Sequence, residues 1–198
     1  MACQRNRIPV SISAGAFLLG ALLLLILPLK WLFAALCAAL VHELCHLAAV
    51  KLTGGLVHEI CIGRGGASIK IGPMDSGKEL VCALSGPVGG LVLLLFVRWI
   101  PRIAICAAIH SVYNLLPIYP LDGGRALRCA AAMRLRPETG EKICDVAEKL
   151  CKTALIGLGI YAAVVLKLGI LPVLGVCIVL FKTKSGKIPC KLPVQRVQ

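Results

Sequence analysis

His42-Glu43-Leu44-Cys45-His46 is a polar pentapeptide inside an apolar run that extends from Trp31 to Leu52. The run is long enough for one helix across a bilayer, which needs roughly 20 residues. Residues four apart share one face of a helix, so the two imidazoles can approach a single metal ion. Ionisable side chains at membrane depth are costly unless they find partners, and the pentapeptide therefore predicts a functional site.

Hydrophobic residues make up 59% of the 198-residue chain and charged residues 16%, which predicts a membrane protein and excludes an ordinary soluble domain. The formal net charge is +13. A nucleic-acid partner would need those basic residues on one folded face, with aromatic residues or a known module among them. Here the basic residues lie in the gaps between apolar runs, so no nucleic-acid partner is predicted.

Six apolar runs predict an all-α polytopic membrane protein with about six transmembrane helices, over residues 8–29, 31–52, 80–97, 103–116, 153–166 and 169–181. The first run resembles a signal peptide, but it is too long for one and lacks a small-x-small cleavage site, so we expect a retained helix. One long tilted helix over the last two runs is the alternative to two separate helices. Pro172 favours two helices that turn near Lys167.

The charges between the runs predict the orientation of the chain in the membrane. With both termini on the cytoplasmic side, only four of the 22 Lys and Arg residues face the other side, namely Lys30, Arg98, Arg102 and Lys167. Lys and Arg concentrate in cytoplasmic loops. The sequence therefore predicts an integral, multi-pass protein with cytoplasmic N- and C-termini.

The connections predict one membrane-embedded domain over residues 1–198, with no PDZ or CBS domain. Isoleucines alternate on both sides of Gly63-Arg64-Gly65-Gly66, which predicts a small membrane-associated β-hairpin over residues 60–71. Residues 123–152 are strongly charged, and Pro137 divides them into two expected short helices on the cytoplasmic surface. None of the eleven cysteines forms a C-x-x-C pair, so we expect reduced thiols and no cysteine-based zinc site.

The pentapeptide offers two Zn²⁺ ligands and a base. His42 and His46 can bind the ion, and Glu43, about 100° round the helix, can take a proton from the water that the ion activates. A chance match is the alternative, and the intramembrane position argues against it.

A catalytic zinc needs a third protein ligand, and Asp122 is the strongest candidate. It lies in the stretch Asn114–Arg125, directly after the fourth apolar run. The second and fourth predicted helices both run towards the cytoplasm, so their carboxyl-terminal ends lie at similar depth. The alternative is a turn or N-cap aspartate.

Three motifs in this order resemble the site-2 protease family: the pentapeptide, Ser85-Gly86-Pro87-Val88-Gly89-Gly90, and the stretch Asn114–Arg125. Short length and the expected absence of accessory domains make the chain similar to the subgroup that contains the stage IV sporulation protein FB. The chain departs from many relatives at Gly89-Gly90, where an asparagine is common. We expect these two glycines to serve close helix packing.

The resemblance implies an intramembrane zinc metalloprotease that cuts a membrane-associated protein, such as a pro-sigma factor, within or near the lipid bilayer. It implies one Zn²⁺ per chain on His42, His46 and Asp122, with Glu43 as the general base. Asn114 would steady the oxyanion, or would only hydrogen-bond a neighbouring helix. Inhibitory membrane proteins and a homo-oligomer are further partners that the resemblance allows.

Two histidines remain, His58 in the hairpin region and His110 in the fourth run, and both are interpreted as structural or gating residues. The hairpin also offers an edge on which an extended substrate could pair.

Two other classes of protein stay open. A catalytically inactive zinc-binding membrane scaffold would need a closed four-ligand site, usually with cysteine, but Cys45 points about 100° away from His46. A metal or proton transporter would need acids in several spans, whereas Glu43 is the one acid firmly within a predicted span.

Overall fold

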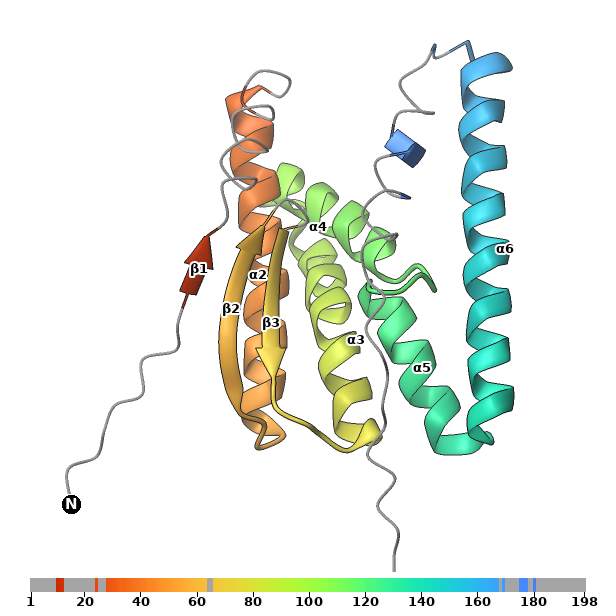
Figure 1. Cartoon of the computed structure of the whole chain (residues 1–198). Coiled ribbons are helices and arrows are strands. Elements are labelled where there is room, and N and C mark those ends of the chain that lie inside the picture. The colour runs from red at the N-terminus through yellow and green to blue at the C-terminus, as the bar shows by residue number, and fades with distance from the viewer. Residues whose placement is uncertain are drawn as a thin grey trace, which may run out of the picture. The chain divides into compact units, whose positions relative to one another are not determined.

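The computed structural model describes residues 10–12, 24, 28–63, 66–167, 169, 175–177 and 180 (Figure 1). This part of the chain is mostly helical, as predicted. Its helices are α2 (Leu29–Leu52), α3 (Ser76–Val92), the short 3₁₀ helix η1 (Leu93–Phe96), α4 (Pro101–Asn114), α5 (Asp122–Arg134) and α6 (Pro137–Val164). The chain divides into two compact units, residues 1–151 and 152–198, and the contacts described below lie within the first.

Helix α2 buries its two histidines and exposes a row of large apolar side chains. The side chains of Phe33, Leu36, Leu40 and Leu44 are between 52% and 65% exposed, and they recur three or four residues apart. The buried face holds small alanines and the two histidines of the pentapeptide. A helix in water shows the opposite distribution, so the exposed stripe of α2 is suited to contact lipid.

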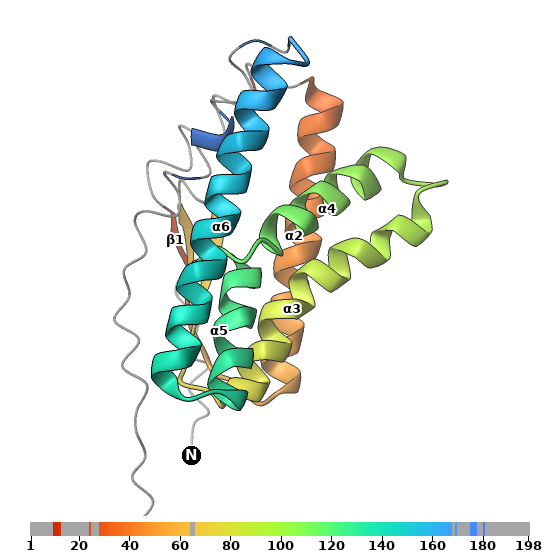
Figure 2. The ribbon, with the colours of Figure 1, turned by 90° about the vertical axis from the view of Figure 1, so that its right-hand side faces the viewer.

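Glycines of α3 allow two of its neighbouring helices, α2 and α4, to approach closely (Figure 2). A Cβ atom added to Gly89 would collide with Sγ of Cys45 on α2, and one added to Gly90 would collide with Oγ of Ser111 on α4. The expected packing role of this glycine pair is therefore confirmed. The helix begins with an N-cap, in which the Asp75 carboxylate accepts a hydrogen bond of 3.2 Å from the Gly77 backbone N–H.

Two helical stretches in the described residues are long and apolar enough to cross a membrane, Leu29–Leu52 and Ser76–Phe96. They include most of the predicted spans 31–52 and 80–97. Helix α4 has only 14 residues between Pro101 and Asn114, which is about 21 Å and less than the ~30 Å hydrocarbon core. The predicted number of six spans stays a prediction.

Residues 57–71 form two antiparallel strands, β2 (Val57–Gly63) and β3 (Gly66–Ile71), in the region where a hairpin is predicted. A third strand was not predicted. β1 (Val10–Ile12) pairs in parallel with residues 60–62 of β2, and the sheet order is β1-β2-β3. The prediction of a helix over 8–29 is wrong at residues 10–12, because an apolar run by itself does not separate strand from helix. Residues 13–23 and 25–27 of that predicted span lie outside the described residues.

The charged segment 123–152 does not hold two short helices. Helix α5 ends at Arg134 as a short helix, but α6 begins at Pro137 and continues to Val164. Proline is favourable in the first turn of a helix, where its missing N–H has no partner to lose, and the apolar residues that follow extend the same helix. Lys167, near which a turn is predicted, has a positive φ of 52°. The predicted span 169–181 lies mostly outside the described residues.

The packing of α3 against α4 gives a testable expectation. Gly90→Ala should lower the free energy of unfolding by about 1–3 kcal/mol, because its Cβ would press on Ser111 and lie 3.3 Å from the Ala107 carbonyl oxygen. Thermal unfolding in detergent measures this. Gly157→Ala is the matched control, since its Cβ would meet nothing within 4 Å. Equal melting temperatures of the two variants would contradict the packing role.

Candidate metal centre

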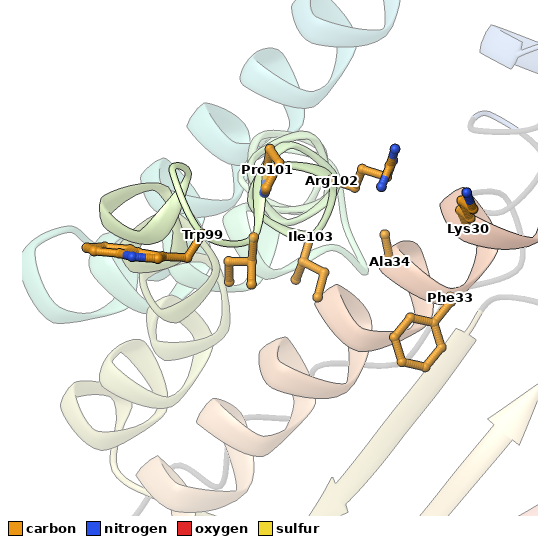
Figure 3. Close-up of a pocket in the computed structure, with 8 residues that line it drawn as sticks. Lys30, Phe33, Ala34, Trp99, Pro101, Arg102 and Ile103 are labelled. Carbon is orange, nitrogen blue, oxygen red and sulfur yellow. The ribbon is translucent and has the colours of Figure 1, made fainter.

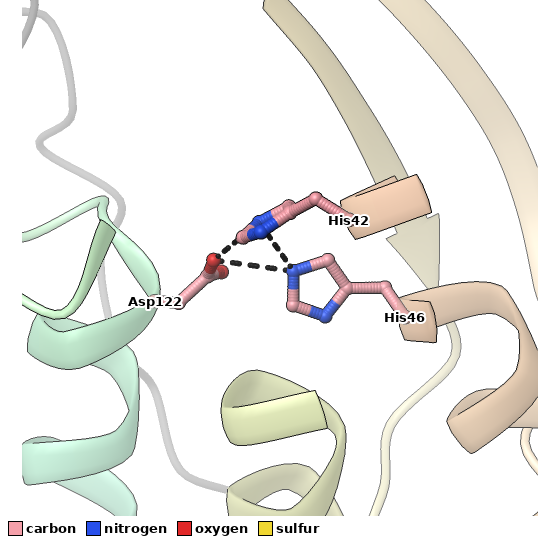
Figure 4. Close-up of side chains that lie close together, drawn as sticks. All are labelled: His42, His46 and Asp122. Carbon is pink, nitrogen blue, oxygen red and sulfur yellow. Dashed lines mark hydrogen bonds and ion pairs between the residues drawn. The ribbon is translucent and has the colours of Figure 1, made fainter. Parts of the chain in front are cut away.

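Three side chains from two helices meet at one buried point (Figure 4). His42 Nε2 lies 3.0 Å from Asp122 Oδ2, and His46 Nε2 lies 3.1 Å from each of those two atoms. The three side chains are all buried, with His42 only 3% exposed. These are the three residues that the sequence predicts as metal ligands, and the fold brings them together from positions 76 and 80 residues apart.

The ring of His46 is held from its other side by α3. Its Nδ1–H donates a 2.7 Å hydrogen bond to the backbone carbonyl of Cys82. The Ser85 hydroxyl donates to the same carbonyl at 2.7 Å and lies 3.3 Å from His46 Nδ1. With the proton on Nδ1, the lone pair of Nε2 is directed at the other two donor atoms, which is the tautomer that a metal ligand needs.

Gly86 leaves the space that the two imidazoles occupy. A Cβ atom at this position would collide with His46 Nε2, and it would lie 2.6 Å from His46 Cε1 and 2.8 Å from His42 Nε2. No side chain fits there without moving both rings. The Ser85-Gly86-Pro87 motif therefore supports the histidine pair in two ways, through the Ser85 hydroxyl and through the missing side chain of Gly86.

Asp122 is placed by the tight connection between α4 and α5. The Gly123 Cα lies against the Leu115 carbonyl, and that of Gly124 against the backbone of Ile118, so neither position has room for a Cβ. Asp122 is the first residue of α5 and its carboxylate points at the imidazoles, whereas the N-cap position is Leu121. The alternative of a capping aspartate is thus wrong.

The neighbouring imidazoles favour the ionised form of the Asp122 carboxylate. A separate ion pair, between Arg125 and Glu79, holds α5 against α3. Burial acts to raise the pKa of Asp122, but hydrogen bonds and charge from the two imidazoles lower it below its ordinary value. Arg125, one turn along α5, lies 3.4 Å from the Glu79 carboxylate on α3. This contact joins α5 to α3 close to the site.

His110 lies beside the site. Its ring centroid is 4.6 Å from that of His42, with the two rings nearly perpendicular, and His42 Nδ1 is buried without a hydrogen-bond partner among the described residues. The sequence placed His110 one turn before Asn114 but gave no sign of this contact. His58 is exposed and does not belong to the cluster, which within the described residues consists of His42, His46 and Asp122.

Glu43 and Asn114 are the other two predicted site residues. Glu43 is half-buried and follows His42 directly on α2. The Asn114 side-chain amide donates a 3.0 Å hydrogen bond to the His110 carbonyl on its own helix. Asn114 therefore donates to a carbonyl of its own helix, α4, and not to a neighbouring helix as one of the two interpretations expected.

The donor set is suited to zinc. Two imidazole nitrogens and one carboxylate oxygen are the ligand types of open, catalytic zinc sites, which keep a fourth position free. Bond lengths of 2.0–2.1 Å in a tetrahedral site place neighbouring ligand atoms about 3.3 Å apart. The observed separations of 3.0–3.1 Å are close to that value. The room that Gly86 leaves for both imidazoles and the fixed tautomer of His46 also fit a metal site.

The role of Gly86 is testable. Gly86→Ala should lose most of its bound zinc, because the added methyl group would displace both imidazoles. Metal analysis of the purified protein measures the zinc content. Gly90→Ala, one turn later on the same helix, should keep its zinc in the folded fraction because its Cβ would touch neither imidazole. Full zinc content in folded Gly86→Ala would contradict this assignment.

No model of a protein family matches the chain, and no curated protein matches it. Among solved structures, it is similar to the Site-2 Protease from Methanocaldococcus jannaschii, with a TM-score of 0.62 and 18% sequence identity, over 92% of each chain. The fold of the chain is therefore similar to that of a site-2 protease.

Proposed function

We propose that the chain is an intramembrane zinc metalloprotease that hydrolyses a peptide bond of a membrane-associated protein within or near the bilayer. The observation that carries this proposal is the buried triangle that His42 Nε2 and His46 Nε2 of the apolar helix α2 form with Asp122 Oδ2 of α5. The structural likeness to a site-2 protease supports it. The exposed apolar stripe of α2 supports the placement in a membrane.

In this proposal His42, His46 and Asp122 hold one Zn²⁺ per chain. A bound zinc ion polarises the substrate carbonyl and lowers the pKa of a water molecule towards about 7. The Asp122 carboxylate would complement that charge, and each imidazole would offer the lone pair of one ring nitrogen. The Cys82 carbonyl and the Ser85 hydroxyl keep His46 in the orientation that this requires.

Glu43 is proposed as the general base. It follows His42 directly and is half-buried, so its carboxylate can take the proton of the attacking water and pass it to the leaving amine. Asn114 is proposed to steady the oxyanion. Its amide nitrogen carries two N–H donors: one donates to the His110 carbonyl in the structure, and the other would donate to the oxyanion.

The sheet suggests where an extended substrate would pair. Residues 60–62 of β2 have a strand on each side, with β1 on one and β3 on the other. Among the described strands, β1 and β3 lie at the two edges of the sheet. The proposed edge for a substrate strand is β3, because its six residues offer more main-chain groups than the three of β1, and such hydrogen bonds hold a strand with little selectivity for side chains.

The remaining parts of the proposal rest on the sequence. The charge bias favours a multi-pass protein with cytoplasmic termini. The family resemblance favours a regulatory precursor as substrate, and it allows inhibitory membrane proteins and a homo-oligomer as partners. Each of these stays a prediction.

The zinc content of purified variants distinguishes the proposed zinc ligands from the proposed general base, Glu43. His46→Phe and Asp122→Ala should each lose zinc, because two remaining protein donors hold the ion too weakly, whereas Glu43→Gln should keep about one zinc per chain. The measurement is metal analysis of each purified variant after dialysis. Glu141→Gln, an exposed position on α6, is the control for a lost carboxylate. Zinc retention by Asp122→Ala would rule out its role as a ligand.

Cleavage separates an enzyme from an inactive zinc-binding scaffold. The chain is co-expressed with candidate membrane-associated precursors, and the products are followed by immunoblot. Glu43→Gln should cut about 10²–10⁴-fold more slowly than the wild type, while Glu141→Gln should cut at the wild-type rate. Equal cleavage by wild type and Glu43→Gln would remove Glu43 from the mechanism. A zinc-loaded wild type that cuts none of the precursors would favour the scaffold.

A further inference from the structure

A pocket lies at the start of α2, away from the donor atoms of His42 and His46. Its volume is about 270 Å³, and it is lined by Lys30, Phe33 and Ala34 at the start of α2 and by residues 99–103 at the start of α4. Figure 3 shows the nitrogen-bearing ends of Lys30 and Arg102 on the same side of this pocket, with the ring of Phe33 on another side. The pocket thus has a cationic side and an apolar side.

The pocket lies at the level expected for lipid headgroups. Helix α2 has 24 residues, with Lys30 near its start and Lys51 near its end, so the two lysines are about 31 Å apart along the axis. This distance equals the thickness of a bilayer's hydrocarbon core, about 30 Å. Trp31 and Trp99, the only two tryptophans of the chain, both lie at the Lys30 end, as in the aromatic belts of membrane proteins.

The positive charge here has no acidic counterpart in this part of the chain. No Asp or Glu precedes Glu43, and none lies between Glu79 and Asp122, so the segments that form this end contain no carboxylate side chain. The starts of α2 and α4 also lack an acidic residue in the first turn and a side-chain cap. Their free backbone N–H groups add to the positive potential.

We propose that this pocket binds an anionic phospholipid, with the phosphate between Lys30 and Arg102 and an acyl chain against Phe33 and Ile103. An apolar side next to two cations matches a headgroup with its chain better than it matches a free anion. An anionic headgroup is favoured over phosphatidylcholine, whose own ammonium group neutralises the phosphate. The proposal rests on the membrane placement in the proposed function, but it does not depend on catalysis.

Native mass spectrometry of the full-length protein in mild detergent tests the proposal, with phosphatidylglycerol and phosphatidylcholine of identical acyl chains as probes. The wild type should retain phosphatidylglycerol preferentially. Lys30→Gln and Arg102→Gln should each weaken that retention about fivefold, because each removes one cation near the headgroup. Arg98→Gln is the matched control: it removes one charge at the same end of the molecule, from a residue that does not line the pocket.

Four outcomes would overturn the proposal. These are equal retention of the two lipids by the wild type, unchanged retention in both pocket variants, the same loss in Arg98→Gln, and displacement of the lipid by millimolar inorganic phosphate, which would indicate a small-anion site. Lys30→Gln and Arg102→Gln are tested separately, so if one of them fails to fold, the other still tests the proposal. Zinc content is measured in the same samples, so a failure of the lipid site is distinguished from a failure of the metal site.

Discussion

The buried contact of two imidazoles with one carboxylate is the constraint around which the fold is arranged. Each of these groups loses hydration when it leaves water, and only close mutual contact offsets that cost. Two helices that are distant in sequence must therefore approach until their donor atoms are about 3 Å apart. An approach of this kind leaves little space for side chains between the helices.

Helix α3 makes that approach possible although it contributes no donor atom to the cluster. Its Cys82 carbonyl orients one imidazole, and its Gly86 leaves the space for both. Gly89 and Gly90 then let α2 and α4 pack closely on two faces of the same turn, about 100° apart. The backbone of α3, rather than its side chains, thus determines the geometry of the site, which explains why small residues are concentrated over one short stretch.

The parts of the fold that follow from local patterns could be predicted, and those that depend on backbone groups or distant pairing could not. The spacing of His42 and His46 fixes their common face on a helix, and the proline and glycine residues around Asp122 indicate a close turn. The hydrogen bond from His46 to the Cys82 carbonyl has no signature in the sequence, because every residue carries a backbone carbonyl. The neighbourhood of His110 depends on how α2 and α4 pack, and strand β1 depends on a partner about 50 residues away.

The position of strand β1 in the sheet affects the order in which the strands pair during folding. β2 and β3 are joined by a short turn and can pair early, whereas β1 is parallel to β2 and separated from it by the whole of α2. Until β1 pairs with β2, the backbone N–H and C=O groups of β2 at residues 60–62 can pair with other strands, including a strand from another copy of the chain. The first strand therefore closes an edge on which a folding molecule would otherwise associate with its neighbours.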